Sequence, residues 1–249
     1  MNLILFEPSE ISADQTVHLD DRRSRHIIDV LGSQPGESLK AGIINGPVGS
    51  AEIISITEDK KRAAVILRFS AEEPVPQPPL CDLILGLVRP IMLKKIMAQA
   101  ASLGVGRIFL INANRVEKSF FGAGLLKDER YRAYLIEGLE QAKDTCLPQV
   151  SIHERFRPFV EDFMPTIAHT YSRMLLAHPA AGQGLKQAVG TATGGRTLLA
   201  VGPEGGWVDF EIDKFTEQSF VPVSMGERVL RTDTAVVALL AQLMVLRDG

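Results

Sequence analysis

The sequence predicts a two-part α/β protein, in which a small β-barrel precedes a larger domain built on a mostly parallel sheet. Segment 73–80 contains four prolines, which interrupt strand hydrogen bonding and favour an extended linker. Before this segment the chain shows short strand-like runs, and after it strand-like and helical segments alternate. We therefore predict a first domain at 1–72, a linker at 73–80 and a second domain at 81–249.

The first domain contains short apolar runs typical of strands, separated by turn signals such as Asn45-Gly46-Pro47. These runs occupy residues 16–19, 38–44, 51–56 and 62–69. A short helix is predicted around 24–31 and ends at Gly32, because glycine readily takes the left-handed conformation that closes a helix. Several short strands with one helix favour a small barrel.

The second domain alternates strand-like and helical segments, which implies a mostly parallel sheet with both faces covered. The predicted strands are 82–88, 107–111, 174–177, 196–201 and 220–225, and the predicted helices are 91–103, 127–142 and 234–247. A further helix is predicted to begin with Asp209 as its capping residue. The last helix is rich in Ala, Val and Leu almost all round, so we expect it to be buried or to form a subunit interface.

The composition is that of an ordinary globular chain, with 45% hydrophobic and 23% charged residues. A net charge of −3 argues against nonspecific coating of nucleic acid, although it allows a local basic patch. No apolar run approaches the roughly 20 residues of a membrane helix, and the first residues lack signal-peptide features, so we expect a cytoplasmic protein. Two cysteines, Cys81 and Cys146, predict neither a disulfide nor a structural metal.

The most informative motif is a glycine-rich loop at 202–206, which follows an apolar strand and is accompanied by the segment 226–234. Its three glycines allow a ligand to approach the backbone closely, and Pro203 stiffens the loop. Open α/β sheets bind ligands beyond the carboxyl ends of their strands, where both segments are expected. Phosphate-binding and dinucleotide-binding glycine patterns do not occur, which disfavours an NTPase or a nicotinamide enzyme.

Together, Gly202-Pro203-Glu204-Gly205-Gly206 and the sequence from Gly226 to Ala235 resemble the C-terminal signature of SPOUT-class RNA methyltransferases, specifically the RsmE family. Weaker resemblance extends to 25–31, 103–105, 140–142 and 175–179. Members of that family methylate N3 of a decoding-centre uridine in 16S ribosomal RNA of the small subunit. The resemblance implies a PUA-like, RNA-binding barrel, a SPOUT domain with a C-terminal trefoil knot, S-adenosyl-L-methionine as methyl donor, and a homodimer without metal or membrane attachment.

The resemblance also implies the residues around the cofactor. A glycine-rich backbone can read adenine edges, while Leu176, Val201, Met225 and Leu230 supply apolar walls. The implied cofactor-binding set is Leu176, Ala177, His178, Val201, Gly202, Glu204, Gly205, Gly206, Met225, Gly226, Leu230, Arg231 and Ala235. For His178, a structural hydrogen-bonding role is an equally good interpretation.

Methylation of uridine N3 requires loss of the imino proton and stabilisation of negative charge on the flanking carbonyl oxygens. Arg231 is our first catalytic candidate, because its guanidinium stays charged and offers paired donors; a cap or a dimer salt bridge is its alternative role. Asp233 or Glu204 would assist deprotonation. Asp233 also suits the first turn of the last helix, and it replaces the family's usual glutamate, which shortens the reach of the carboxylate.

Basic residues near the N-terminus and after the first strand of the second domain are candidates for RNA contact: Arg22, Arg23, Arg25, His26, Arg89, Lys94 and Lys95. Solvated surface charge is the alternative interpretation of each. Gly32 stands where many family members carry an arginine, which predicts a weaker or shifted contact. Two further functions stay open: methylation of another RNA or base atom, and a non-catalytic RNA-binding or ribosome-assembly module.

Overall fold

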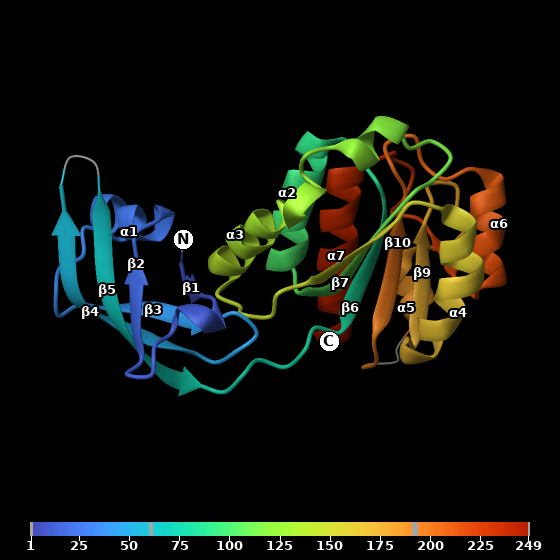
Figure 1. Cartoon of the computed structure of the whole chain (residues 1–249). Helices are drawn as coiled ribbons and strands as arrows, with labels where there is room; N and C mark the ends of the chain where they lie inside the picture. The colour runs from blue at the N-terminus through green and yellow to red at the C-terminus, as the bar shows by residue number, and fades with distance from the viewer. Residues whose placement is uncertain (1, 60–61, 191–193, 249) are drawn as a thin grey trace. The chain divides into compact units, whose positions relative to one another are not determined.

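The computed structural model describes residues 2–59, 62–190 and 194–248 (Figure 1). The chain divides into two compact units. The first unit combines Met1–Pro78 with Ile136–Leu147, and the second combines Pro79–Leu135 with Pro148–Gly249. The first unit therefore includes a segment from the middle of the chain. The predicted domain bounds assign that segment to the second domain.

The first unit is built on a five-stranded sheet with the order β1-β3-β4-β5-β2. Its strands are β1 (Ile4–Phe6), β2 (Thr16–Leu19), β3 (Ser38–Ile43), β4 (Val48–Glu58) and β5 (Ala63–Glu73). The pair β1 and β3 is parallel, and the other pairs are antiparallel. Alternate apolar residues of β5, including Val65, Leu67 and Phe69, form the core with Phe6 and Ile53. The closure of this sheet into a PUA-like barrel stays a prediction.

The predicted helix near the N-terminus consists of α1 (Arg22–Arg25) and the wider π-helical turn η2 (His26–Val30). Ser24 is buried and its hydroxyl donates to the carbonyl of Ala63 at 2.7 Å, which fixes α1 against β5. Ile27 enters the core on the same side. Gly32 follows with a φ of 64°, as expected for a residue that ends a helix.

The segment Ile136–Leu147 completes the first unit through hydrogen bonds to three of its loops and strands. It begins in α3 (Arg132–Ala142), whose Glu140 carbonyl accepts from the Asn2 amide at 3.1 Å. The Glu140 carboxylate accepts from both terminal nitrogens of Arg22, at 2.7 and 3.0 Å. Further along, the Thr145 hydroxyl donates to the Gly46 carbonyl at 2.7 Å. Glu140 and Thr145 are buried, so these bonds satisfy polar side chains of the segment itself.

The second unit contains a six-stranded sheet in which every pairing is parallel, which confirms the predicted parallel α/β fold. The order is β11-β9-β10-β6-β7-β8, with β6 (Cys81–Gly86), β7 (Val105–Ile111), β8 (Gln149–His153), β9 (Arg173–Ala177), β10 (Thr197–Val201) and β11 (Val221–Val223). The central strands β6 and β10 are buried along their whole length, as their continuous apolar sequences predict.

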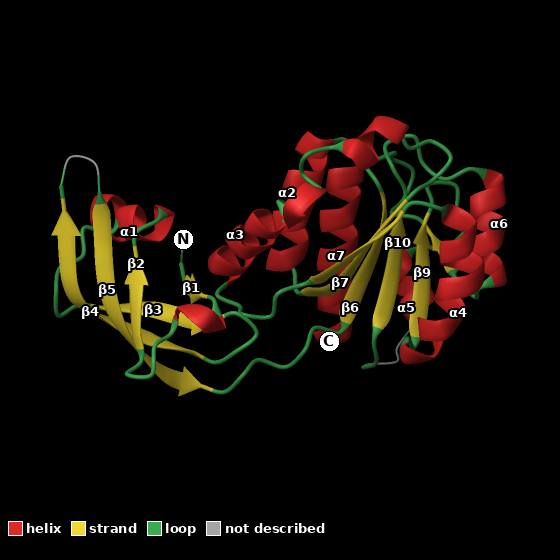
Figure 2. Cartoon of the chain, in the orientation of Figure 1, coloured by secondary structure: helices red, strands yellow, loops and turns green. Residues whose placement is uncertain are grey.

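Helices flank this sheet (Figure 2). They are α2 (Pro90–Ser102), α4 (Met164–Ile167), α5 (Leu185–Val189), α6 (Asp209–Glu217) and α7 (Thr232–Asp248). The apolar α7 packs against α2, α5 and β10, and Val236, Leu239 and Leu240 are almost fully buried. Within the described residues no helix is both long and apolar enough to cross a membrane.

One predicted cap is wrong. Asp209 is the first helical residue of α6, and Val208 is the capping residue. The amide of Val208 donates instead to the Glu211 carboxylate at 3.0 Å, so an acid three residues into the helix replaces the expected cap.

Candidate functional site

A cavity of about 300 Å³ lies where three neighbouring strands of the parallel sheet end. Ala177 ends β9, Val201 ends β10 and Val223 ends β11, and all three residues line the cavity. Parallel strands present their carboxyl ends at one edge, which is where open α/β sheets bind ligands. The loops that follow these strands, together with the start of α7, form the remaining walls.

The glycine-rich loop 202–206 is a tight turn in which the Gly206 amide donates to the Pro203 carbonyl at 2.8 Å. Gly206 has a φ of +73°, which disfavours a side chain at this position. A Cβ on Gly86, at the end of β6, would lie 2.5 Å from Cδ of Pro203. The loop therefore packs directly on the end of β6, and glycine at position 86 makes this close approach possible.

The second loop, 224–231, closes the cavity from the side of β11. Its Gly226 has a φ of +99° and open space around it, so the chain turns there without a side chain. Ser224 is anchored by its amide to the Gln183 carbonyl at 2.9 Å. Leu230 and Thr232 line the cavity, and the Ala235 amide donates to the Arg231 carbonyl at 2.8 Å as α7 begins.

Trp207 is the single tryptophan of the chain and lines the cavity. Its ring packs edge-on against Phe215, with centroids 5.2 Å apart. Its indole Nε1 is buried and has no acceptor among the described residues. An unpaired buried donor is costly in a protein, and a ligand acceptor would remove that cost.

Arg115, from the loop after β7, covers the glycine loop. Its guanidinium donates to the Gly205 carbonyl at 2.6 Å, and the residue lines the cavity. The neighbouring Asn114 amide donates to the Glu211 carboxylate at 2.6 Å. Because Glu211 also accepts from Val208, this buried acid joins the Arg115 loop to the chain that follows Trp207.

The structure brings most of the predicted cofactor residues together around this cavity: Ala177, His178, Val201, Gly202, Glu204, Gly205, Gly206, Met225, Gly226, Leu230 and Ala235. Leu176 and Arg231 are not in its walls. Leu176 is fully buried inside β9, where it pairs with Ala200 and Pro222. The Arg231 side chain is 77% exposed. The His178 amide donates to the Val223 carbonyl at 2.9 Å.

The three predicted catalytic residues lie at the two loops of the cavity. Arg231 Nε is 3.9 Å from Oδ1 of Asp233, and that oxygen is buried without a hydrogen-bond donor among the described residues. Asp233 also occupies the first turn of α7, where an acid favours the helix dipole. Oε1 of Glu204 accepts from the backbone amide of Arg89 at 3.1 Å, at the start of α2.

The basic residues predicted to contact RNA in the first unit differ in their availability. Arg23 donates to Glu10, Asp21 and the Leu5 carbonyl, and its side chain is only 11% exposed. Although burial opposes the charge, these hydrogen bonds raise the pKa of Arg23, and the bond from Arg23 lowers the pKa of Glu10. Arg23 thus has a structural role in this arrangement.

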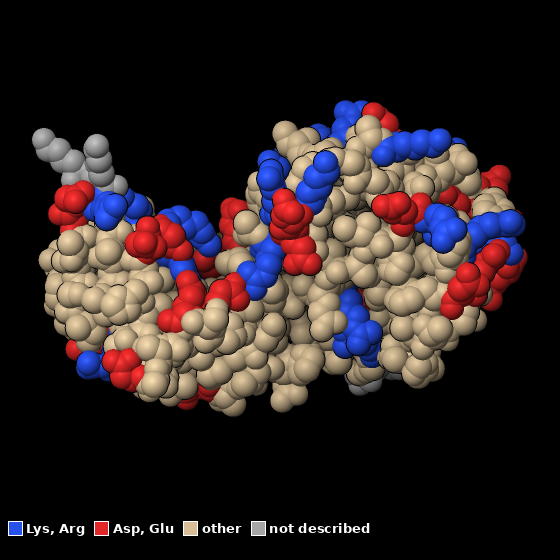
Figure 3. Space-filling model, viewed as in Figure 1, with Lys and Arg blue, Asp and Glu red and all other residues tan. Residues whose placement is uncertain are grey.

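Arg22 and Arg25 are more accessible, with side chains 56% and 40% exposed. Arg22 is paired with Glu140, and Arg25 lies 3.4 Å from Glu58. His26 has a buried Nε2 without a partner among the described residues. On the face shown in Figure 3, acidic side chains are interspersed among the basic ones, so no purely basic surface marks an RNA site there.

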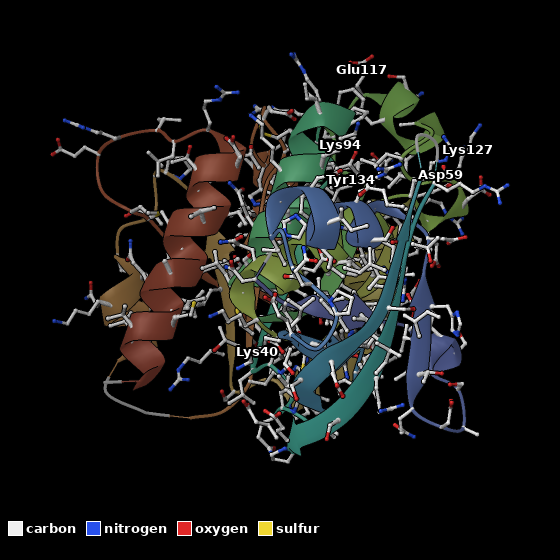
Figure 4. The ribbon with its side chains drawn as sticks, turned by 90° about the vertical axis from the view of Figure 1, so that its left-hand side faces the viewer. Lys40, Asp59, Lys94, Glu117, Lys127 and Tyr134 are labelled. Carbon is white, nitrogen blue, oxygen red and sulfur yellow. The ribbon has the colours of Figure 1, made fainter. Side chains whose placement is uncertain are left out.

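Of the basic residues predicted in the second unit, Arg89 immediately precedes α2, and Lys94 and Lys95 lie within it. Arg89, Lys94 and Lys95 are exposed. Nζ of Lys94 lies over the ring of Tyr134, 5.5 Å from its centroid, and both residues are labelled in Figure 4. This cation–π contact orients Lys94 at modest cost and leaves its charge accessible.

Sequence reasoning missed the parts of the site that lie outside the two motifs. Arg115 and Asn114 are separated from the glycine loop by about ninety residues of chain. The available signal was their position just beyond the predicted strand 107–111, at the same edge of the sheet as the motif. Trp207 adjoins the motif, but its buried, unpaired nitrogen is visible only in three dimensions.

Comparison with known proteins identifies the family. Residues 75–244 match the sequence model described as the RNA methyltransferase domain. The chain is 35% identical over 240 residues to the ribosomal RNA small subunit methyltransferase E of Treponema pallidum (strain Nichols), covering 96% of this chain and 88% of the relative. The chain belongs to the ribosomal RNA small subunit methyltransferase E family.

Other members are more distant in sequence. Ribosomal RNA small subunit methyltransferase E 1 of Borreliella burgdorferi is 26% identical and covers 96% of this chain and 95% of its own length. The crystal structure of ribosomal RNA small subunit methyltransferase E from Neisseria gonorrhoeae, bound to S-adenosyl methionine, has a TM-score of 0.74 and 23% identity. The match covers 99% of this chain and 98% of that protein, which shows that the whole fold is shared.

Proposed function

We propose that this protein is an S-adenosylmethionine-dependent methyltransferase that acts on N3 of a decoding-centre uridine in 16S ribosomal RNA. Membership of the methyltransferase E family supports the reaction and the RNA class. The observation that carries the proposal is the cavity at the ends of β9, β10 and β11, whose walls contain the glycine-rich loop and the segment 224–235.

The residues of this cavity suit S-adenosylmethionine. Its volume of about 300 Å³ is at the lower end of small-molecule sites. Val201, Leu230 and Leu239 supply apolar walls, while the backbone of 202–206 offers polar groups without intervening side chains. The buried, unpaired Nε1 of Trp207 is a donor that a bound ligand would satisfy. These features support cofactor binding by the loops 202–206 and 224–230.

The bound cofactor would supply an electrophilic methyl group. The remaining requirements concern the uridine: its N3 proton must leave and charge on the adjacent carbonyl oxygens must be stabilised. We propose that Arg231, which is exposed beside the cavity, donates to those oxygens. Asp233 or Glu204 would accept the proton. Asp233 is the first choice, because its Oδ1 receives no hydrogen bond from the described residues and is free to accept one.

The family also suggests the domain architecture and the partners of the protein. We infer that the first unit is a PUA-like RNA-binding domain, that the second contains the trefoil knot of SPOUT proteins, and that the protein acts as a homodimer on the small ribosomal subunit in the cytoplasm. The exposed Arg22 and Arg25, with Arg89, Lys94 and Lys95, are the proposed RNA contacts. Arg23 is left out of this set because its donors are occupied within the protein.

The deciding experiment is methyl transfer from labelled S-adenosylmethionine to small ribosomal subunits that lack the modification, followed by mass spectrometry of the nucleosides. We expect N3-methyluridine. A different methylated nucleoside would keep the fold and donor but change the target. Cofactor binding by calorimetry without transfer to any RNA would point to a non-catalytic assembly role.

A further inference from the structure

A second cavity of about 300 Å³ lies at the carboxyl ends of β7 and β8. The loop after β7 separates it from the cofactor cavity, because Asn114 lines the second cavity and the next residue, Arg115, lines the first. Glu211 also lines the second cavity and holds the Asn114 amide. The two cavities are therefore neighbours at one edge of the sheet.

An aromatic and guanidinium platform forms one side of this second cavity. Phe210, the second residue of α6, is 43% exposed, so its ring is accessible to a ligand in this cavity. The guanidinium carbon of Arg157 lies 5.1 Å from the Phe210 ring centroid. Phe156 lies 6.2 Å from Phe210 and packs edge-on against the core residue Phe215. Planar groups of this kind stack on nucleobases of single-stranded RNA.

The charge of the cavity suits a phosphodiester. The only acid in its walls, among the described residues, is Glu211, whose two oxygens already accept from Asn114 and Val208. The cations in its walls are Arg157 and Lys118. Arg157 shares Glu161 with Lys214, at 3.8 and 3.3 Å, while Lys118 has no ion pair within the described residues. Lys118 thus remains available for a phosphate.

We propose that this cavity binds a nucleotide that flanks the target uridine, with its base stacked on Phe210 and Arg157 and its phosphate near Lys118. The proposal rests on the proposed function, since it assumes an RNA substrate at the cofactor cavity. An Arg157–Phe210 pair that merely covers the start of α6 would need neither an adjacent cavity nor an unpaired lysine. The neighbouring position of the two cavities allows one continuous strand to occupy both.

The test compares F210A and F210L, which lose the aromatic face, with F210W, which keeps it. Affinity for protein-free 16S ribosomal RNA and for unmodified small subunits is measured by filter binding, and cofactor affinity by calorimetry. We expect F210A and F210L to bind both RNA forms about tenfold more weakly, F210W to bind as wild type, and cofactor affinity to stay unchanged in all three. K118A should reduce the slope of log RNA affinity against log salt concentration by about one, as expected for the loss of one phosphate contact.

An I152A variant, which removes an exposed apolar side chain from β8 outside the walls of both cavities, controls for general surface effects. Wild-type RNA affinity in F210A and F210L, or equal losses in F210L and F210W, would overturn the proposal while leaving the proposed function intact. If F210A and F210L bound subunits more weakly but protein-free RNA normally, the cavity would contact a ribosomal protein and not a nucleotide, and the proposal would also be overturned. Absence of cofactor binding and transfer in the wild type would instead remove the proposed function itself.

Discussion

The guanidinium of Arg115 donates a hydrogen bond of 2.6 Å to the carbonyl of Gly205, which joins the loop after β7 to the glycine-rich loop of the cavity. The same side chain packs on Gly205, where a Cβ would lie 2.9 Å from Cβ of Arg115. Nothing in the two sequence motifs points to this contact. We infer that Arg115 positions the glycine loop for the cofactor.

Replacing Arg115 by alanine should weaken S-adenosylmethionine binding about tenfold, because a charge-assisted hydrogen bond to the cavity loop is lost. Arg115 is exposed, so the melting temperature should change little. Calorimetry and thermal unfolding measure the two effects. The matched control is R130A, because Arg130 is 67% exposed and its ion pair with Asp128 is long at 4.0 Å. Equal cofactor affinity in R115A and wild type would remove the positioning role.

Gly205→Val should abolish cofactor binding without unfolding the protein. The added side chain would meet Cβ and Cδ of Arg115 at 2.9 and 3.0 Å and displace the loop that lines the cavity. Gly122→Val is the control, because a Cβ there meets nothing within 4 Å. Circular dichroism checks folding and calorimetry checks binding. Normal binding by G205V would show that the glycine loop does not contact the ligand.

Arg231→Ala should reduce methyl transfer about a hundredfold with cofactor affinity much less affected, because the guanidinium is outside the cavity walls and is proposed to stabilise charge on the uridine. Asp233→Asn should also slow transfer, whereas Asp233→Glu should retain it. Single-turnover kinetics with saturating cofactor separate the chemical step from binding. Unchanged turnover in R231A would leave Arg231 with only its contact to Asp233.

Asp82→Asn should lower the free energy of unfolding by about 3 kcal/mol, because it leaves a largely buried arginine uncompensated. Asp82 is fully buried and accepts two bonds of 2.7 Å from Arg196 and one of 2.6 Å from the Tyr171 hydroxyl. Urea unfolding measures the change. Asp128→Asn, at a carboxylate that is 84% exposed, should change stability by less than about 0.5 kcal/mol. Similar stabilities of the two variants would contradict a structural role for the Asp82 cluster.

Stability should fall as pH is lowered below the ordinary histidine pKa of 6.5, in part through His153. Burial lowers the pKa of His153, which packs between Phe159 and Phe163 with centroids 4.7 and 4.8 Å away. The unfolded chain therefore binds the proton first, and folding stability is lost from about pH 6.5 downward. Thermal unfolding of wild type and H153Q from pH 8 to 5 should show a smaller loss of stability at acid pH in the variant. H169Q, at an exposed histidine, should behave as wild type.

Much of the second unit could be predicted from the sequence because its signals are local. The apolar runs at 82–88 and 196–201 correspond to the fully buried β6 and β10, and the glycine motif lies where parallel strands end. Strand β8 was missed because its burial is mixed at the sheet edge, so no continuous apolar run marks it. Strand β1 was missed because three residues are too short to show a period.

The periodicity of apolar residues in the sequence cannot predict contacts between distant segments. Arg22 was predicted to contact RNA, and no local pattern indicates that Glu140 would pair with it. Likewise Arg23 is part of a cluster with Glu10 that sequence spacing does not reveal. In both cases only the fold brings the acidic partner near, but Arg22 stays 56% exposed whereas Arg23 is 11% exposed.

The intervening segment Ile136–Leu147 has a consequence for how the chain is made. When residues up to Pro78 have left the ribosome, the partner of Arg22 and the hydroxyl that binds the Gly46 carbonyl have not yet been synthesised. Domains usually fold in order of synthesis. Here the strands and core of the N-terminal sheet are available early, whereas its hydrogen bonds to Glu140 and Thr145 form only after α3 has been made, and a fragment cut at the proline-rich segment would lack these bonds.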